Sequence, residues 1–395
     1  MIGGGTSIRA AGSPPVRVGF ILPKSGPLAA EAHSLMSGFE LFLKEQARRA
    51  PTLELLRKDP GPDEKKTLEA LAALVMNKEV QFLVGPLSLE ASEKTVHGVK
   101  GRKVVLFVTN PSVRLVAGEM CLPMSFSLCA NTYQRSHPIA PWAVKNVGLK
   151  AFITGSDNWL GNEQADFFAA GFERAGGSFV DRIMVSKGGE KIKEVVEAVR
   201  KGKPDLVFAA FRGGQAVAFV KAFREQAAPL SLPLIGPEAL VQFPQTLDRQ
   251  GKEAPGIRTL STLKNPQAFT SRIKRRLNRD IADSARAAEG YDIANAICQA
   301  VRGTGHATNE LSEVVRELEK LDIEGPRGVV RFDKNHEPIL ETMVQEWKIK
   351  GSSFERHVVE NLGAVASPDF GCGRVGFPKR PAMESEESQP GEPEE

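Results

Sequence analysis

The stretch that decides the fold runs from Val16 to Phe42 and reads VRVGFILPKSGPLAAEAHSLMSGFELF. Its first residues are mostly apolar and β-branched, which predicts a short buried strand over 16–22. Prolines and a glycine within 23–27 end that strand, and apolar side chains then recur at helical spacing, which predicts a helix beginning within 28–33. A strand, a Gly/Pro loop and a helix form half of a βαβ unit, and open α/β sheets bind their ligands at such loops.

The composition of this loop argues against a nucleotide site. No G-x-G-x-x-G run follows a predicted strand, no G-x-x-x-x-G-K-[S/T] run occurs, and Gly3-Gly4-Gly5 precedes every predicted strand. Pro23 and Pro27 also lack the backbone N–H groups that a phosphate would use. The loop is therefore expected to bind a ligand other than a phosphate, or none.

Length and composition indicate an ordinary globular protein of two lobes. The chain has 395 residues, which is long for one hydrophobic core, and 41% of them are hydrophobic and 25% charged. The net charge of +4 is spread, apart from the basic run Arg272–Arg276 on a predicted helix, which we interpret as a solvated face and not a nucleic-acid site. No stretch approaches the roughly 20 apolar residues of a membrane span, so we expect a soluble protein.

The start of the chain and the cysteines bear on its compartment. Residues 1–15 lack the apolar core of a secretory signal, although Ala10-Ala11-Gly12 resembles the small-residue end of one. No cysteine lies near the start of the chain, so we do not expect a lipid anchor. The four cysteines show no spacing typical of zinc sites, and we predict neither a metal nor a cofactor. Cys121 and Cys129 are expected either to form a disulfide in an oxidising compartment or to remain two partly buried thiols.

Strand and helix patterns alternate along most of the chain. After the first unit, further strands are predicted at 53–57, 80–84 and 104–108 with helices between them, which is typical of a parallel sheet covered on both faces. The alternation restarts after 125–132 and predicts a second doubly wound lobe, with strands at 151–154, 178–185, 206–210 and 232–235. Residues 343–350 are predicted to be an edge strand, and the Pro/Gly/Glu-rich tail from about 367 is predicted to be disordered.

The sequence does not point to catalysis. It contains no G-x-S-x-G or H-E-x-x-H motif, and its six histidines are scattered over predicted helices and loops. Instead, six loops follow predicted strands, at 24–31, 85–90, 109–114, 156–161, 211–214 and 236–238. If both sheets direct their carboxyl ends at one cleft, these loops converge on it. Their hydroxyl groups, helix N-termini, Trp159, Arg212 and Glu238 suit a small polar ligand enclosed by hinge closure.

Five stretches carry a family resemblance: VGFILPKSGPLA at 18–29, VQFLVGP at 80–86, LPLIGPEAL at 232–240, RAAEGYDIANAICQAV at 286–301 and IEGPRGVVRFDKNHEP at 323–338. In this order they resemble the type I periplasmic solute-binding proteins of branched-chain amino acid ABC transporters, the leucine/isoleucine/valine-binding kind. The resemblance spans about Val16 to Gly363.

The resemblance implies an α/β fold of two doubly wound parallel-sheet lobes joined by three crossovers. The expected limits are 16–130 plus 260–333 for the N-terminal lobe, 131–259 plus 334–363 for the C-terminal lobe, and disorder in 1–15 and 367–395. It also implies a monomeric periplasmic protein that is not an enzyme and that delivers a small molecule to a membrane permease. A sensor of the same fold, which signals to a partner protein and could be cytoplasmic, is the alternative.

The resemblance also assigns candidate ligand-binding residues. In the family, a serine after the third strand holds the ligand carboxylate, and Leu89 stands there with Ser88 beside it. Ser112 and Val113 occupy the position of small residues and a threonine after the fourth strand. Glu238 matches the glutamate that receives the amino group.

Two further positions depart from the family, since Glu31 stands where an aromatic residue is usual and Trp159-Leu160 where a tyrosine is common.

These departures weaken the prediction of a standard branched-chain amino acid. A carboxylate facing Leu89 and Val113 would lose hydrogen bonds worth roughly 1–3 kcal/mol each. We expect instead that Arg212 or Arg114 holds an anion and that Glu31 meets an additional amine or hydroxyl, which leaves amino acid-like ligands, amides and aromatic or other organic acids open. The complete set of candidate ligand-binding residues is Ser25, Glu31, Ser88, Leu89, Asn110, Ser112, Val113, Trp159, Leu160, Arg212 and Glu238.

Overall fold

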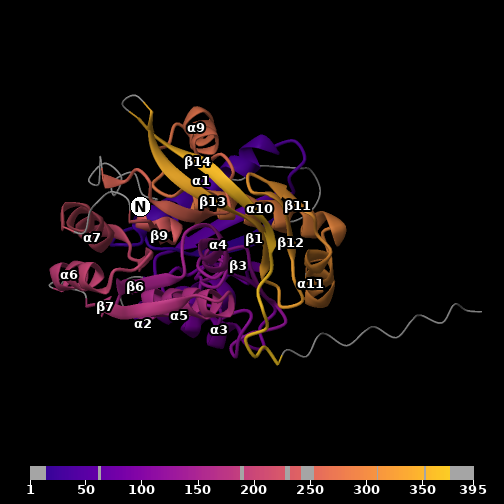
Figure 1. Cartoon of the computed structure of the whole chain (residues 1–395). Coiled ribbons are helices and arrows are strands. Elements are labelled where there is room, and N and C mark those ends of the chain that lie inside the picture. The colour runs from indigo at the N-terminus through magenta and orange to yellow at the C-terminus, as the bar shows by residue number, and fades with distance from the viewer. Residues whose placement is uncertain are drawn as a thin grey trace, which may run out of the picture.

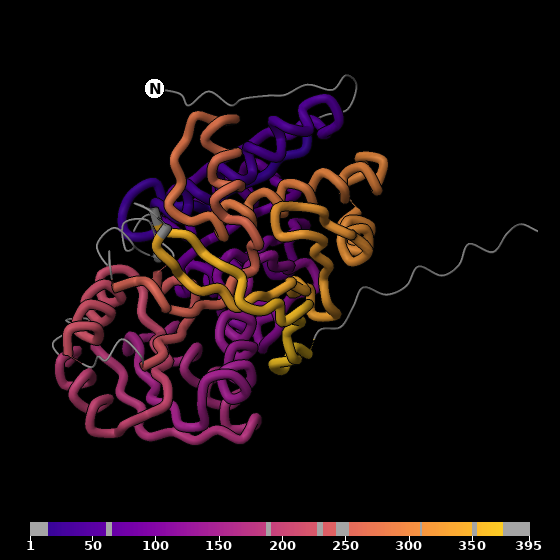
Figure 2. The backbone as a smooth tube through the Cα atoms, turned by 45° about the horizontal axis from the view of Figure 1, so that its top comes forward, coloured from indigo at the N-terminus to yellow at the C-terminus, as the bar shows by residue number. Residues whose placement is uncertain are grey.

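The computed structural model describes residues 15–60, 64–186, 191–226, 232–241, 253–308, 310–350 and 353–373. They form two lobes, each built on a sheet with helices packed against it (Figure 1). Figure 2 shows the first lobe at the top, made from indigo and orange segments, and the second lobe below it in magenta and pink. The chain therefore builds most of the first lobe, builds the second and then returns, and the predicted α/β fold of two helix-covered lobes is confirmed.

The sheet of the first lobe is entirely parallel, in the order β2–β1–β3–β4–β5. Its strands are β1 (Val16–Ile21), β2 (Leu53–Lys58), β3 (Phe82–Val84), β4 (Val105–Val108) and β5 (Ser125–Ser127). The helices between them are α1 (Ala29–Glu45), α2 (Glu64–Leu71) with its π-helical extension η1 (Ala72–Met76), and α3 (Leu89–Val99). The helices that return to this lobe are α9 (Pro266–Leu277), α10 (Ser284–Gly303) and α11 (Leu311–Glu319).

Alternate side chains of these strands face two different cores. Phe20 and Phe82 pack with α1 and α10 on one face of the sheet, whereas Ile21 and Leu83 pack with α2 and α3 on the other. Both faces are buried, as a parallel sheet requires. The predicted strand–loop–helix unit at the start of the chain is β1 followed by α1, so the first lobe matches its sequence pattern.

The second lobe is built on the larger sheet, in the order β11–β12–β13–β10–β9–β8–β6–β7 with β14 paired to β13. The β11–β12 end of this sheet packs in the core of the first lobe. Its strands are β6 (Lys150–Ser156), β7 (Ser178–Val185), β8 (Leu206–Ala210), β9 (Leu234–Gly236), β10 (Arg258–Ser261), β11 (Ile323–Gly325), β12 (Gly328–Phe332), β13 (Pro338–Lys350) and β14 (Ser353–Val365). Its helical segments are α4 (Ile139–Asn146), α5 (Trp159–Arg174), α6 (Ile192–Gly202), α7 (Gly213–Gln226) and the 3-10 turn η2 (Glu238–Leu240).

This sheet is mixed, which corrects the purely parallel second lobe that the sequence predicted. β13 runs antiparallel to β10, β12 and β14. Residues 343–350, predicted to be an edge strand, belong to β13 and lie between β10 and β14 where these strands pair. Antiparallel strands can be joined by a short turn without a helix between them. The alternation of strands and helices, which identifies the parallel part of the sheet, therefore does not reveal them.

Three segments, 128–138, 262–265 and 333–337, connect the lobes. The last of them follows β12, whose residues hydrogen-bond into the larger sheet while Val330 and Phe332 pack in the core of the first lobe. The sheets alone therefore do not divide the chain at one residue, and the lobe limits expected from the sequence stay a prediction. Residues 1–14 and 374–395 of the predicted disordered ends lie outside the described residues.

A disulfide holds the C-terminal end of the described chain to the first lobe. Cys372 is bonded to Cys121 across a sequence separation of 251 residues, and the Phe370 N–H donates to the Ala117 carbonyl oxygen at 3.0 Å. Residues 367–373 therefore form ordered structure, which corrects the prediction that disorder begins at 367. The alternatives for Cys121 and Cys129 are both wrong in part, because Cys121 pairs with Cys372 while Cys129 is a buried free thiol.

Replacing both bonded cysteines, Cys121→Ser with Cys372→Ser, is expected to lower the free energy of unfolding by about 2–4 kcal/mol, because a cross-link over a long loop restricts the unfolded chain. Urea unfolding with and without dithiothreitol measures this. The unmodified protein should lose stability in the reductant, whereas the double variant should not respond to it. An equal stability of the unmodified protein in both conditions contradicts the disulfide.

Candidate functional site

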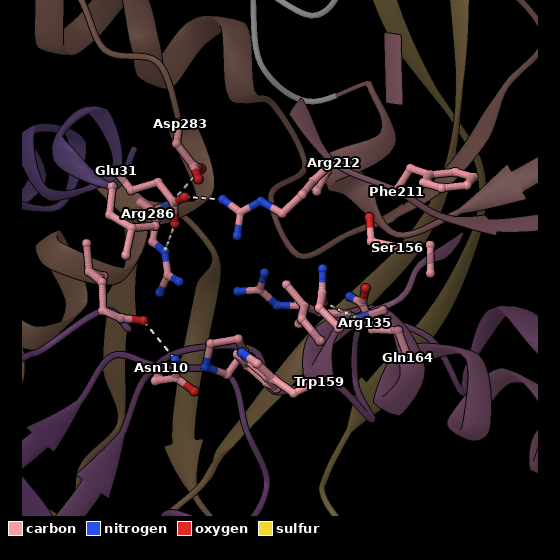
Figure 3. Close-up of a pocket in the computed structure, with 18 residues that line it drawn as sticks. Glu31, Asn110, Arg135, Ser156, Trp159, Gln164, Phe211, Arg212, Asp283 and Arg286 are labelled. Atoms are coloured by element: carbon pink, nitrogen blue, oxygen red, sulfur yellow. Dashed lines mark hydrogen bonds and ion pairs between the residues drawn. The ribbon is translucent and has the colours of Figure 1, made fainter. Parts of the chain in front are cut away.

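A cavity of about 50 Å³ lies between the two lobes, where loops at the carboxyl ends of both sheets meet (Figure 3). The first lobe contributes the start of α1 and the loops after β3 and β4, and the second contributes the loops after β6, β8 and β9. The connection 128–138 and the start of α10 complete the lining. The residues that line it are Leu28, Glu31, Leu87, Asn110, Pro111, Arg135, Ser156, Asn158, Trp159, Leu160, Gly161, Gln164, Ala210, Phe211, Arg212, Ala239, Asp283 and Arg286.

Two helices of the first lobe bring the charged residues together. A Cβ atom at Gly38 of α1 would lie 1.7 Å from the Ala287 carbonyl oxygen, and one at Gly290 of α10 would lie 1.9 Å from the Leu35 carbonyl oxygen. Only glycine allows the backbones of α1 and α10 to approach so closely. This packing places Glu31, in the first turn of α1, beside residues at the start of α10.

Arg286 is the buried centre of the charged lining. Its Nη1 donates to the Thr109 carbonyl oxygen at 2.6 Å and to Glu289 Oε2 at 2.7 Å, and its Nε donates to Glu31 Oε2 at 3.3 Å. The side chain is 6% exposed. A buried charge needs such partners, so Arg286 is held by both neighbouring carboxylates.

Glu31 links the two lobes. Its other carboxylate oxygen, Oε1, accepts a hydrogen bond from Arg212, which follows β8 in the second lobe, and Figure 3 shows the two side chains pointing at each other across the cavity. Burial raises the pKa of Glu31, but the positive charges of Arg212 and Arg286 outweigh burial, so the net pKa lies below its ordinary value. Glu31 is therefore a carboxylate held between two guanidinium groups.

Arg135 differs from the other two arginines. Its Nε donates to the Ala130 carbonyl oxygen at 2.6 Å and its Nη2 contacts Cys129 Sγ at 3.3 Å. Within the described ranges, no carboxylate lies at ion-pair distance from its guanidinium group. The lining thus contains three guanidinium groups and two carboxyl groups, and Arg135 carries the positive charge that is left without a carboxylate among the described residues.

Asp283 begins α10 and is the second carboxyl group of the lining. Its Oδ1 accepts the Arg286 N–H at 2.9 Å and so caps the helix. Burial, followed by the charge of Glu31, raises the pKa of Asp283 to about 6, against the opposing effect of Arg286. This carboxyl group therefore titrates close to neutral pH.

Of the candidate ligand-binding residues, the structure brings five into the cavity: Glu31, Asn110, Trp159, Leu160 and Arg212. Asn110 is held by its own hydrogen bonds, since its Nδ2 donates to the Leu87 carbonyl oxygen at 2.7 Å and its Oδ1 accepts the Ser112 N–H at 3.0 Å. Trp159 and Leu160 enter the cavity because Asn158 caps the N-terminus of α5. Trp159 remains 36% exposed.

The other candidates do not line this cavity. Ser25 and Ser88 lie on a separate groove of the first lobe, and Ser88 caps α3. Leu89 packs against the core under α2 and α3, and Ser112 and Val113 are buried within the loop after β4. The ligand-binding role that the family resemblance implies for them stays a prediction.

Glu238 and Arg114 also have other partners. The Glu238 carboxylate is paired with Arg356 of β14 and accepts from Ser261 Oγ at 3.3 Å, on a small second cavity behind Arg135. Arg114 pairs at the surface with Glu93 and Glu119. Neither residue offers a free charge to a ligand in the main cavity.

Sequence reasoning missed Arg135, Asp283 and Arg286. Arg286 opens the stretch at 286–301 that carries the family resemblance, and Asp283 stands at the N-cap position before it, so a helix-start signal was present. Arg135 lies in a connection between lobes, and no local pattern marks it.

The described ranges contain no group of His, Cys, Asp and Glu side chains arranged to hold a metal ion. They also contain no helix with the length and apolarity needed to span a membrane.

Comparisons with known proteins agree with this architecture. The sequence matches the family described as periplasmic binding protein over residues 15–353. A relative named Leu/Ile/Val-binding protein homolog 6, from Brucella melitensis, is 24% identical over 345 residues, which cover 83% of this chain and 86% of the relative.

Solved structures share the fold. An ABC transporter solute-binding protein from R. palustris, in complex with benzoate, has a TM-score of 0.77 at 21% identity, covering 91% of this chain and 100% of that one. A leucine-binding protein from Thermotoga maritima has a TM-score of 0.72 at 17% identity, covering 87% of this chain and 97% of that one.

Proposed function

This chain belongs to the periplasmic binding protein family, and on that premise we propose that it binds a small organic acid, with an aromatic monocarboxylate as the best fit, for an ABC importer. Its relatives are solute-binding proteins of ABC transporters, and the chain is likewise a binding protein and not an enzyme. The ligand class, the site residues and the partner are the parts that we propose.

The observation that carries the ligand class is the guanidinium group of Arg135, which lines the cavity without a carboxylate partner among the described residues. Guanidinium groups bind carboxylates through paired, charge-assisted hydrogen bonds. Around it, Leu28, Leu87 and Phe211 supply apolar surface and Trp159 supplies an aromatic face. A ligand with one carboxylate and a flat apolar body matches both features.

An α-amino acid fits less well. Its ammonium group would need a free carboxylate, and Glu238, the residue expected to provide one, is paired with Arg356. Glu31 is engaged by Arg212 and Arg286. The benzoate complex of the R. palustris protein, which shares this fold, supports the choice of an aromatic acid.

Ligand entry requires the lobes to separate. A cavity of about 50 Å³ holds a few water molecules but not a benzene ring with a carboxylate. The Glu31–Arg212 contact is one of the interactions that opening must break. The ligand can then shift the open–closed equilibrium only by its difference in affinity for the two states.

We also propose that the protein works as a monomer outside the cytoplasm and delivers its ligand to a membrane permease. The Cys121–Cys372 disulfide supports this location, because such bonds persist in oxidising compartments. A sensor of the same fold is the rival. Co-purification with an ABC permease, stimulated by the ligand, would favour delivery, whereas ligand-dependent capture of a signalling protein would favour the sensor.

A thermal-shift screen of the purified protein tests the ligand class. Benzoate and hydroxybenzoates should raise the melting temperature by mass action, whereas leucine, isoleucine and valine should not. A larger shift with leucine than with every aromatic acid would contradict the proposal. Size-exclusion chromatography of the same sample should show a monomer.

The affinity for benzoate is expected to rise as the pH falls from 8 to 6 and to level off below about 6, where Asp283 is already protonated in the free protein. An added anion disfavours the Asp283 carboxylate, so its pKa is higher in the complex and binding takes up a proton. Glu31 and Arg286 beside it stay charged in this range, because, against the effect of burial, the arginines lower the pKa of Glu31 and the neighbouring carboxylates raise the pKa of Arg286. Calorimetric titrations at several pH values measure the effect.

The matched control is Asp283→Asn, which keeps the N-cap hydrogen bond and removes the titrating group. Its affinity for benzoate should be independent of pH between 8 and 6. A pH dependence equal to that of the unmodified protein would assign the effect to another group.

A further inference from the structure

We propose that Glu31 acts as a built-in second carboxylate, which restricts the site to monocarboxylates and excludes dicarboxylates. The inference rests on the proposed function and specifies its ligand class. It starts from an unusual arrangement, because the two oxygens of Glu31 are divided between arginines of different lobes: Oε1 accepts from Arg212 and Oε2 from Arg286. A ligand carboxylate clamped between two closing lobes would make the same contacts.

Glu31 and Arg286, two of the three residues in this arrangement, are buried in the protein. The side chain of Glu31 is 7% exposed and that of Arg286 is 6% exposed. Arg212, from the second lobe, is 38% exposed, so only its side of the ion pair is open to solvent. Of the three guanidinium groups in the lining, those of Arg212 and Arg286 therefore already bind a carboxylate of the protein itself, that of Glu31.

Arg135 is the guanidinium group that remains for a ligand, and Figure 3 shows it in the same space as Arg212 and Glu31. A second carboxylate on the ligand would lie near Glu31 and Asp283, with both arginines beside it engaged. Like charges repel more strongly beside largely buried groups such as Glu31 and Asp283 than they do in bulk water. The site therefore accepts one carboxylate and rejects a second.

Removing Glu31 should reverse this selectivity. Glu31→Ala takes away one negative charge, frees Arg212 and leaves the space of the glutamate side chain empty. Arg286 keeps Glu289 at 2.7 Å and the Thr109 carbonyl oxygen at 2.6 Å, so the buried guanidinium is still paired. A benzenedicarboxylate could then place one carboxylate on Arg135 and the other where Glu31 was.

The experiment is a calorimetric titration of the unmodified protein and of Glu31→Ala with benzoate and with the three benzenedicarboxylates. We expect the unmodified protein to bind benzoate and to bind each dicarboxylate at least about a hundredfold more weakly, a ratio that corresponds to about 2.7 kcal/mol. Glu31→Ala should bind at least one dicarboxylate tenfold or more tightly than the unmodified protein does.

Two further variants make the result interpretable. Glu31→Gln keeps the volume and removes the charge, so it should also gain dicarboxylate binding if the alanine variant does not fold. Glu40→Ala changes the same residue type on the same helix, but Glu40 pairs with Arg279 away from the cavity, so its selectivity should not change.

The outcomes separate this inference from the proposed function. If the unmodified protein binds benzoate and both Glu31 variants still reject every dicarboxylate, the role of Glu31 is wrong and the organic-acid site stands. If the unmodified protein binds mono- and dicarboxylates equally, the role of Glu31 is also wrong. If no variant binds any carboxylate, the proposed ligand class fails and this inference fails with it.

Discussion

Arg135→Ala is expected to weaken benzoate binding about thirtyfold or more, the largest effect of any single change in the cavity. Truncating one partner of a buried, hydrogen-bonded charge pair costs roughly 2–5 kcal/mol, much of it from the charge left unpaired. Arg135 is the guanidinium group that the described carboxylates leave unpaired, whereas Arg212 and Arg286 are engaged by Glu31. Calorimetric titration with benzoate measures the loss.

Two controls separate recognition of the carboxylate from general damage. Arg135→Lys keeps the charge without the planar pair of donors and should lose less affinity than the alanine variant. Arg114→Ala removes an arginine of the first lobe that pairs with Glu93 and Glu119 at the surface, and it should bind benzoate like the unmodified protein. Unchanged binding by Arg135→Ala would show that another residue holds the carboxylate.

Asp292→Ala is expected to lower the free energy of unfolding by about 3–5 kcal/mol, because it leaves the charge of Arg327 in the core without its partner. Arg327 Nε donates to Asp292 Oδ2 at 2.6 Å, and their side chains are 2% and 0% exposed. Arg327 Nη1 also donates to the Leu128 carbonyl oxygen at 2.8 Å, so the pair supports a connection between the lobes. The midpoint and slope of urea unfolding give the loss.

The chain provides a matched surface pair for comparison. Arg331 and Asp322 approach to 2.5 Å, but each side chain is 58% exposed. Water screens such a pair, so Asp322→Ala should change stability far less than Asp292→Ala. Adding Arg327→Met to Asp292→Ala should restore part of the lost stability, since it removes the unpaired charge. Equal losses for the two aspartate variants would contradict the argument from burial.

The sequence predicted well those features that depend on local patterns. Apolar runs ended by Gly/Pro breakers identified β1, β3 and β4, and the restart of the alternation identified the second lobe. Glu31, Trp159 and Arg212 were predicted to line a cleft because loops that follow parallel strands meet at one edge of a sheet, and the structure places all three at the cavity. The family resemblance pointed to the same two-lobed fold, which the comparisons confirm.

The features that the sequence did not reveal depend on contacts between distant parts of the chain. The pairing of β13 with β10 and β14 depends on which strands meet, and the bond between Cys121 and Cys372 joins residues 251 positions apart. In the same way, only the folded structure distinguishes Arg212, which is hydrogen-bonded to Glu31, from Arg135, which is not. The ligand-binding role of each remains a prediction until it is measured.

We propose that the cavity recognises a carboxylate through the guanidinium group of Arg135. The most direct test is a calorimetric titration of the unmodified protein with benzoate and with benzamide, which has nearly the same shape and no charge. We predict that benzoate binds and that benzamide binds at least about thirtyfold more weakly, because the amide loses the charge-assisted pair with Arg135. Equal affinities for the two compounds would show that the cavity does not recognise the negative charge of the carboxylate.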